Sequence, residues 1–539
     1  MPQEQKGSPE KAPIVRSIFS YSLATLLSRI SGFVRETAWA ALIGPTQFSD
    51  IFLFVYTIPN LMRRLLGEGA IASAFVPLFN SVEKQSGIEE ARKLSSTIYT
   101  LQTMITTAFT VLTMLVCIII RFTAPPDSTI VIYAEYLAVL APYAVFICAD
   151  AFLASLLNAR RIYFLPNMVQ VIINVFWLGL TFVAVWAFQP RYGLTVLGGG
   201  VVAVCAYTVW MLAARAKKEG VAVEFTLRHL KTTPALQGFF ARYWLVILGS
   251  ASYTINVLID RLFVQFLVPG EGAMTIFYQG ERLMQLPLGV LAVSVGTVAL
   301  TELSKSVFEE DKFRDNFTRL MRIAGFLAIP TTVVMVMLAV PLVDFSLNYG
   351  KFAAASADLH ALSRAANVLI CYMVGLPAFF LMQVLTKVYF SINELKITVR
   401  VSTWMIVFNV VANIAVLRYT TMGESGLALT SSIASWLSVL LLSWALHHRM
   451  PKLGSWAGVK SFLSFIPAAA IAGVGLWACL HLFDGMTGRS VLDRFLRLAV
   501  PSLVFFGIYF AVNAVFRVPE ARSLVRRLFR RSASQPPLK

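Results

Sequence analysis

Residues 28–36 read SRISGFVRE and lie inside an otherwise apolar stretch that runs from residue 16 to residue 43. A stretch of that length can cross a membrane as a helix, because about 20 mostly apolar residues are enough. A charged side chain near the bilayer centre is costly, so Arg29 and Arg35 need a partner or a task there. Arginine can also bind two phosphate oxygens with its planar fork. The stretch therefore predicts a membrane helix that binds an anion.

The rest of the chain has the same character. Of its 539 residues, 57% are hydrophobic and 14% are charged, whereas a soluble domain carries about 25% charged residues. Long apolar runs, in place of short alternating segments, exclude a transmembrane β-barrel. We predict an all-α polytopic membrane protein with about 14 transmembrane helices, at residues 16–43, 49–82, 95–123, 129–157, 163–188, 193–216, 236–268, 273–304, 317–347, 359–390, 397–418, 424–447, 458–483 and 491–516.

The net charge of +18 is distributed unevenly. Basic residues gather in alternate loops and in the tail, where Arg526, Arg527, Arg530 and Arg531 follow one another closely. This is the positive-inside pattern, and an even number of spans puts both termini in the cytoplasm. The pattern explains the positive charge without a nucleic-acid partner. The basic tail is either an orientation signal or a short helix on anionic lipid.

An internal repeat is faintly visible. LMRRLLG at residues 61–67 resembles LMQLPLG at residues 283–289, and each lies in the second span of a six-span unit. Internal repeats are common in transporters, with the binding site between the halves. Two more arginines mark these segments, since Arg63 lies in the first and Arg282 directly precedes the second. The sequence therefore suggests one anion site shared by two halves.

Each arginine has a second interpretation. Arg35 could pair with Glu36 or Asp50 and lock the first two spans together, while a bend at Ser31-Gly32 could instead bring Arg35 and Arg29 to one face. Arg64 and Glu68 are four residues apart and can pair along one helix face, which leaves Arg63 facing a cavity or reaching for the membrane surface. Arg282 precedes Pro287, and the adjacent Glu281 cannot share its face.

A second polar cluster could bind a cation. It consists of Asp260 with two amides that share a helix face, Asn409 and Asn413, and a hydroxyl from Ser431 or Thr430. One carboxylate with amide and hydroxyl oxygens suits a hard cation such as Na⁺. Alternatively, these side chains join helices through hydrogen bonds, and Asp260 neutralises Arg261. No other cofactor and no enzymatic activity are predicted, because the P-loop, HExxH and GxSxG patterns are missing.

The first two spans resemble the MurJ/MviN family of lipid II flippases in the MOP transporter superfamily. The resemblance is carried by SRISGFVRE at residues 28–36, PNLMRRLLGEGA at residues 59–70 and ERLMQLPLGV at residues 281–290. It implies two pseudo-symmetric six-helix lobes, at residues 16–217 and 236–447, and two further helices within residues 458–516 that form a groove for a lipid tail. Residues 1–15 and 517–539 would be cytoplasmic tails.

The resemblance also implies a function in cell-wall (peptidoglycan) synthesis and cell shape. The cargo would be lipid II, an undecaprenyl-pyrophosphate disaccharide-pentapeptide, moved across the bacterial inner membrane by alternating access. Arg29, Arg35, Arg63 and Arg282 would bind it, supported by the nearby charges Glu36, Asp50, Arg64, Glu68 and Glu281, and the Asp260 cluster would bind Na⁺. Membrane lipids and cell-wall synthesis proteins would be its other partners. The alternatives are a MOP exporter of another undecaprenyl-linked glycan and a cation-coupled drug antiporter, although an exporter of cations should have an acidic cavity.

Overall fold

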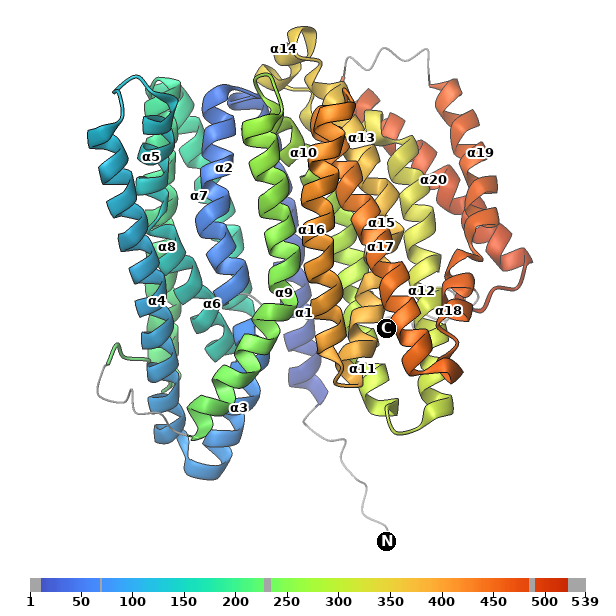
Figure 1. The fold of residues 1–539 in the computed structure, drawn as a ribbon, viewed down its shortest axis with the longest axis horizontal. Helices are drawn as coiled ribbons and strands as arrows, with labels where there is room; N and C mark the ends of the chain where they lie inside the picture. Colours follow the sequence, from blue (N-terminus) through green and yellow to red (C-terminus); the bar gives the residue numbers. More distant parts are fainter. Residues whose placement is uncertain (1–10, 68–69, 227–233, 484–489, 522–539) are drawn as a thin grey trace, which may run out of the picture. The chain divides into compact units, whose positions relative to one another are not determined.

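The computed structural model describes residues 11–67, 70–226, 234–483 and 490–521, and these residues are almost entirely helical (Figure 1). They contain no strand, so the all-α prediction is confirmed. Eleven of their helical stretches are long and apolar enough to cross a membrane, which makes this a multi-pass membrane protein. The count of fourteen spans stays a prediction. The chain forms two compact units, residues 1–261 with 350–352 and residues 262–349 with 353–539.

The first unit is built on α4, α6, α7 and α8. The helix α1 packs on α7, α7 packs on α8, and α4 packs on α3, α5 and α6. Its elements are α1 (Lys11–Leu42), α2 (Gln47–Met62), the π-helix η1 (Arg63–Gly67), α3 (Ala70–Ser86), α4 (Ile88–Thr123), α5 (Thr129–Leu140), α6 (Tyr143–Ala159), α7 (Phe164–Ala187), α8 (Pro190–Lys218) and α9 (Pro234–Leu267), whose last six residues belong to the second unit.

An aromatic cluster fixes α1, α2 and α7 to one another. Trp39 of α1 lies 5.3 Å from the ring of Phe52, and Trp177 of α7 lies 5.1 Å from Tyr56. All four side chains are buried. Each aromatic pair of this kind contributes about 0.5–1.5 kcal/mol beyond area burial. The cluster therefore holds the helices that carry the first three arginines in a defined arrangement.

The second unit is arranged around α15, which packs against α10, α11, α12, α13 and α17. A glycine permits the close approach of α15 to α17, because a Cβ at Gly375 would lie 2.6 Å from the hydroxyl of Ser432 on α17. The elements of this unit are α10 (Ala273–Pro287), the π-helix η2 (Leu288–Ala292), α11 (Val293–Ser306), α12 (Glu310–Met337), α13 (Ala339–Leu347), α14 (Gly350–Asp358), α15 (Ala361–Ser391), α16 (Leu395–Tyr419), α17 (Gly423–Arg449), η3 (Pro451–Leu453), α18 (Ser455–Leu463), α19 (Ile466–Leu482) and α20 (Val491–Val515).

The two units share one irregularity. In the first, α2 passes through the π-helix η1 before α3, and in the second, α10 passes through η2 before α11. The two π-helices lie in or just after the two matching sequence segments, at residues 63–67 and 288–292. Pro59 and Pro287 lie just upstream, where a proline removes one helical hydrogen bond. Single π-turns occur frequently at functional sites. Their recurrence supports the internal repeat.

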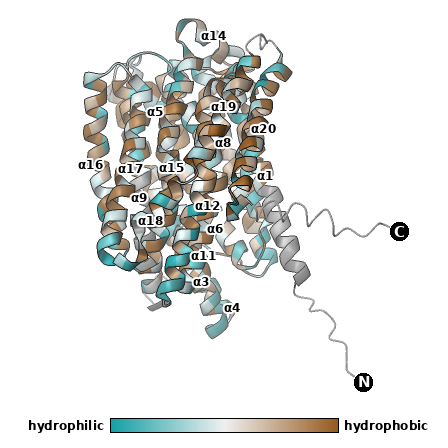
Figure 2. Ribbon diagram, turned by 90° about the vertical axis from the view of Figure 1, so that its right-hand side faces the viewer, coloured by the Kyte–Doolittle hydropathy of each residue, from teal (hydrophilic) through white to brown (hydrophobic). Residues whose placement is uncertain are grey.

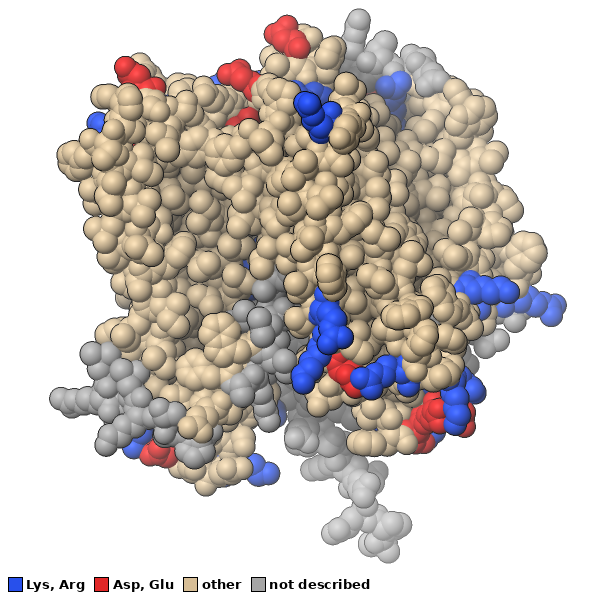
Figure 3. Space-filling model, viewed as in Figure 1, with Lys and Arg blue, Asp and Glu red and all other residues tan. Residues whose placement is uncertain are grey.

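Several helices begin earlier than their apolar stretch. The helix α4 begins at Ile88 and not at residue 95, because Glu89 and Glu90 lie in its first turn and pair with Arg92 and Lys93. Residues 304–322, between two apolar stretches, contain the end of α11 and the start of α12. Hydropathy colouring shows apolar residues along the helices and hydrophilic ones toward ends such as those of α3 and α4 (Figure 2). In the second unit, Lys and Arg mix with Asp and Glu near α11, α12 and α18 (Figure 3).

Candidate functional site

Arg29 and Arg35 occupy different faces of α1. Arg29 is exposed and forms no hydrogen bond or ion pair with any residue that the structure describes, whereas only 8% of Arg35 is exposed. The helix continues through Ser31 and Gly32. This stretch lies against Asn174 of α7, since a Cβ on Gly32 would meet its amide nitrogen at 3.4 Å. The alignment of Arg29 and Arg35 by a bend stays a prediction.

Arg35 is held within the first unit. Its guanidinium donates to Asn174 Oδ1 at 3.1 Å, pairs with Glu36 and lies 4.8 Å from the ring centre of Trp177. The ion pair with Glu36 agrees with the interpretation in which Arg35 pairs with a neighbouring residue. The hydrogen bond to Asn174 also joins α1 to α7, and the pairing of Arg35 with Asp50 stays a prediction.

Asn174 was missed by the sequence analysis. It is 2% exposed, and its amide nitrogen lies 3.1 Å from the Ser31 hydroxyl and 3.3 Å from the Ser28 carbonyl, while Gln170 donates to its oxygen at 3.3 Å. The sequence signal was a pair of amide side chains, Gln170 and Asn174, four residues apart in an apolar span. Such residues usually join membrane helices by hydrogen bonds. Only the fold shows that this one also positions an arginine.

Arg63 is the first residue of η1 and is half-buried. Its Nε donates to Asn60 Oδ1 at 2.8 Å, one turn earlier on α2. The Tyr243 hydroxyl of α9 donates to the Leu66 carbonyl in η1 at 2.8 Å, which satisfies backbone in the irregular turn. Arg64 is also half-buried, and Asp50 is buried in the first turn of α2. Glu68, the expected partner of Arg64, lies outside the described residues.

Arg282 belongs to the second unit and sits in a polar chain on α10. Its guanidinium donates to the Tyr278 hydroxyl at 2.7 Å and to Gln285 Oε1 at 3.1 Å, and Gln285 donates to Glu281 at 2.7 Å. Glu281 is 2% exposed. Glu281 therefore reaches Arg282 through Gln285, four residues along the helix, which agrees with their predicted different faces. The convergence of Arg282 with the three arginines of the first unit stays a prediction.

The second polar cluster forms a closed network on α16 and α17. Asn413 donates to Asn409 Oδ1 at 2.8 Å and accepts a hydrogen bond from Thr430, while Asn409 Nδ2 lies 3.3 Å from the Ser431 hydroxyl. Both amides are buried, so these bonds join the two helices. In this arrangement both hydroxyls take part. Asp260 is 3% exposed and belongs to the first unit, where its neighbour Arg261 donates to Thr57 at 2.7 Å.

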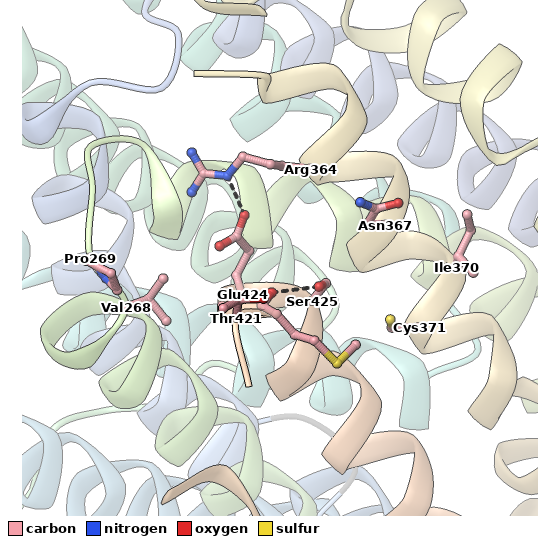
Figure 4. A pocket seen from close by; sticks show the side chains of 11 residues that line it. Val268, Pro269, Arg364, Asn367, Ile370, Cys371, Thr421, Glu424 and Ser425 are labelled. Atoms are coloured by element: carbon pink, nitrogen blue, oxygen red, sulfur yellow. Dashed lines mark hydrogen bonds and ion pairs between the residues drawn. The ribbon is translucent and has the colours of Figure 1, made fainter. Parts of the chain in front are cut away.

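An ion pair in the second unit was also missed. Arg364 of α15 donates through Nε to Glu424 at 2.6 Å, and Glu424 is 5% exposed in the first turn of α17 (Figure 4). The pair lines a cavity of about 630 Å³ together with Asn367, Thr421 and Ser425. The two residues are 60 positions apart in the chain. Sequence spacing gave no signal for this pair.

A sequence profile of the lipid II flippase MurJ family matches residues 39–511, which is most of the chain. The chain belongs to the lipid II flippase MurJ family. The matched residues include Arg63 and Arg282, while Arg29 and Arg35 precede them.

Relatives extend the similarity to nearly the full length. The lipid II flippase MurJ of Burkholderia cenocepacia is 27% identical, with 93% of this chain and 96% of that protein covered. The probable lipid II flippase MurJ of Buchnera aphidicola from Acyrthosiphon pisum is 26% identical, with 92% and 95% covered. A solved MurJ structure in an inward closed conformation is 23% identical, with a TM-score of 0.71 and 91% and 98% covered. The MurJ fold prediction is thereby confirmed.

Proposed function

We propose that this protein moves lipid II from the inner to the outer leaflet of the bacterial cytoplasmic membrane, for peptidoglycan synthesis. Family membership supports this cargo. The structural observation that carries the proposal is Arg29, a cation exposed on an apolar helix without an ion-pair partner among the described residues. A free guanidinium in such a helix is costly unless an anion reaches it. The proposed activity is transport, without a chemical step.

The arginines have different roles in this proposal. Arg29 and Arg63 offer donors to the pyrophosphate, and Asn60 orients the Arg63 guanidinium through Nε. Arg282 contributes from the second unit, where Tyr278 and Gln285 orient its guanidinium. Arg35 holds α1 on α7 through Asn174. Binding of the anion neutralises these charges and permits the change between inward-open and outward-open states.

Complementation of a flippase-depleted strain tests the role of Arg29. Arg29→Ala should abolish growth while the protein remains in the membrane, because the pyrophosphate loses its exposed donor. The matched control is Arg121→Ala, which removes an exposed arginine from the last turn of α4. Full activity of Arg29→Ala would refute the pyrophosphate role, and equal loss in both variants would indicate a general effect of charge.

Binding measurements test the cargo itself. Native mass spectrometry of the purified protein should show lipid II bound in preference to an undecaprenyl-linked glycan without the peptide. Arg29→Ala should reduce the bound fraction of lipid II. Equal binding of both lipids would favour another undecaprenyl-linked cargo.

Orientation in the membrane is part of the proposal. The basic loops and tail support cytoplasmic termini and a location in the inner membrane. Cysteine accessibility in intact cells, with single cysteines placed at residues 5 and 535 of a cysteine-free variant, tests it. Labelling of either position by a reagent that does not cross the inner membrane would contradict the orientation. Association with cell-wall synthesis proteins stays part of the same proposal.

We also propose a sodium ion as a coupling ion, bound by Asn409, Asn413, Ser431 or Thr430, and Asp260. The amide and hydroxyl oxygens suit Na⁺, and Asp260 would supply the negative charge. Their present hydrogen bonds would have to be exchanged for contacts with the ion. Transport by the wild type should depend on Na⁺, and Asn413→Leu should weaken that dependence. Unchanged transport when K⁺ replaces Na⁺ would refute the coupling.

A further inference from the structure

Asp150 is a carboxyl group buried inside the first unit. It lies near the middle of α6 and is 3% exposed. The Thr208 hydroxyl on α8 lies 2.6 Å from its Oδ2, and its Oδ1 is buried with no hydrogen-bond partner. No basic side chain in the described part of the chain forms an ion pair with it. A buried carboxylate needs such pairing to remain ionised.

The Thr208 hydroxyl has a single hydrogen but lies close to two acceptor oxygens. Its hydroxyl oxygen lies 2.6 Å from Asp150 Oδ2 and also 2.9 Å from the Cys205 carbonyl oxygen one turn earlier on α8. A hydroxyl has one hydrogen and can donate it to only one of these oxygens. If Asp150 is ionised, Thr208 can donate to only one of the two oxygens, and the other short contact joins two acceptors. If Asp150 carries a proton, it donates to Thr208 and Thr208 donates to Cys205, so both short contacts are satisfied.

The titratable groups on the helices around Asp150 do not supply a positive charge that would balance an ionised carboxylate. From α4, the Tyr99 hydroxyl lies within electrostatic range, and from α8, so does the Cys205 thiol. The Tyr56 hydroxyl of α2 bonds to Tyr143 of α6, and Arg160, just after α6, pairs with Glu83 of α3. All of these are neutral or already paired.

One cation is connected to this region. The charge of Arg63 in η1 acts on the thiol of Cys205, as does the charge of Asp150. Arg63 also acts on Cys148, two residues before Asp150 on α6. Cys205 therefore lies within electrostatic range of both groups, and in a weakly polarisable interior the field of a charged Asp150 would extend toward Arg63 as well. An ionised Asp150 would offset the positive charge that Arg63 presents to an anion.

We propose that Asp150 is a proton-binding site of the first unit, which holds one proton taken from water while α6 and α8 pack as seen here. The proton passes no further than the carboxyl and returns to water when water reaches this helix interface. With the proton bound, Asp150 is neutral and Arg63 keeps its full attraction for an anion. This last step alone rests on the proposed lipid II function.

Infrared difference spectroscopy of the full-length protein in lipid nanodiscs tests the site directly. At neutral pH the wild type should show the carbonyl stretch of a neutral carboxyl group, and Asp150→Asn should lose one such band. Asp127→Asn removes an exposed loop carboxylate and should lose none. Thr208→Val keeps the carboxyl but removes its hydrogen-bond acceptor, so the band should shift to higher frequency. An unchanged band in Asp150→Asn overturns the proposal.

Titration of pyrophosphate binding tests the connection to Arg63. Undecaprenyl pyrophosphate should bind the wild type more weakly as pH rises through the titration of Asp150, approaching about tenfold per pH unit only if the coupling is strong. Asp150→Asn should bind equally well at all of these pH values. A pH dependence that survives in Asp150→Asn overturns the connection. If the wild type binds no pyrophosphate lipid, the flippase proposal fails, while the infrared result still decides the proton site.

Discussion

Replacing Asn174 by Leu should weaken the contact between α1 and α7 without removing any charge. The change deletes the acceptor of Arg35 at 3.1 Å and the donor to Ser31 at 3.1 Å and Ser28 at 3.3 Å. A hydrogen bond to a charged group contributes about 1.5–3 kcal/mol. A neutral hydrogen bond between membrane helices contributes about 0.6 kcal/mol. Losing one charged hydrogen bond and the neutral hydrogen bonds to Ser28 and Ser31 should therefore lower the free energy of unfolding by about 2–4 kcal/mol.

The measurement is unfolding of the purified protein by sodium dodecyl sulfate in mixed micelles. The control is Asn167→Leu on the same helix, because Asn167 makes one local bond, to the Tyr163 carbonyl at 2.7 Å. Asn167→Leu should lower the free energy of unfolding by about 0.6 kcal/mol. If Asn174→Leu is no less stable than Asn167→Leu, Arg35 is not held by α7 and the reasoning fails. If it is less stable and also fails to complement, the lock is required for function.

Two further variants test the packing of α12 against α18 and the ion pair between Arg322 and Glu520. In Gly325→Ala the new Cβ would lie 2.3 Å from the Phe462 carbonyl oxygen, so α12 and α18 must separate and the melting temperature should fall, whereas Gly179→Ala meets nothing within 4 Å and should leave it unchanged. Burial raises the pKa of Glu520, but the hydrogen bonds from Arg322 at 2.8 and 3.0 Å, a backbone hydrogen bond and the charges of Arg322 and Arg319 together hold that pKa below the usual 4.5. A lowered pKa stabilises the fold above pH 4.5 and loses that effect as pH falls further, so Glu520→Gln should be less stable than wild type at neutral pH and equal to it only in strong acid. Equal stability of Glu520→Gln and the wild type at neutral pH would show that the ion pair between Arg322 and Glu520 does not stabilise the fold.

Several local features could be predicted from sequence because their causes are local. Long apolar stretches specify helices that must satisfy their own backbone in a membrane, which made the all-α fold predictable. The repeated LM segment indicated two related halves, and both contain a π-helix near it. The proximity of Arg35 to Glu36 also followed from adjacency in the chain. Helix ends were less predictable, since charged first turns extend α4 beyond its apolar stretch.

The sequence by itself determined the class of protein, the residues with unusual charge and, through resemblance, the family. Only the tertiary structure decided which charges are already paired. Arg35 meets Asn174 across 139 residues, Thr208 meets Asp150 across 58, and Arg364 meets Glu424 across 60. Such contacts depend on how helices rotate and pack, and periodicity within one helix does not specify its partner. The structure therefore left Arg29 exposed, gave Arg35 a positioning role, and revealed Asp150 as a buried carboxyl without an ion pair among the described residues.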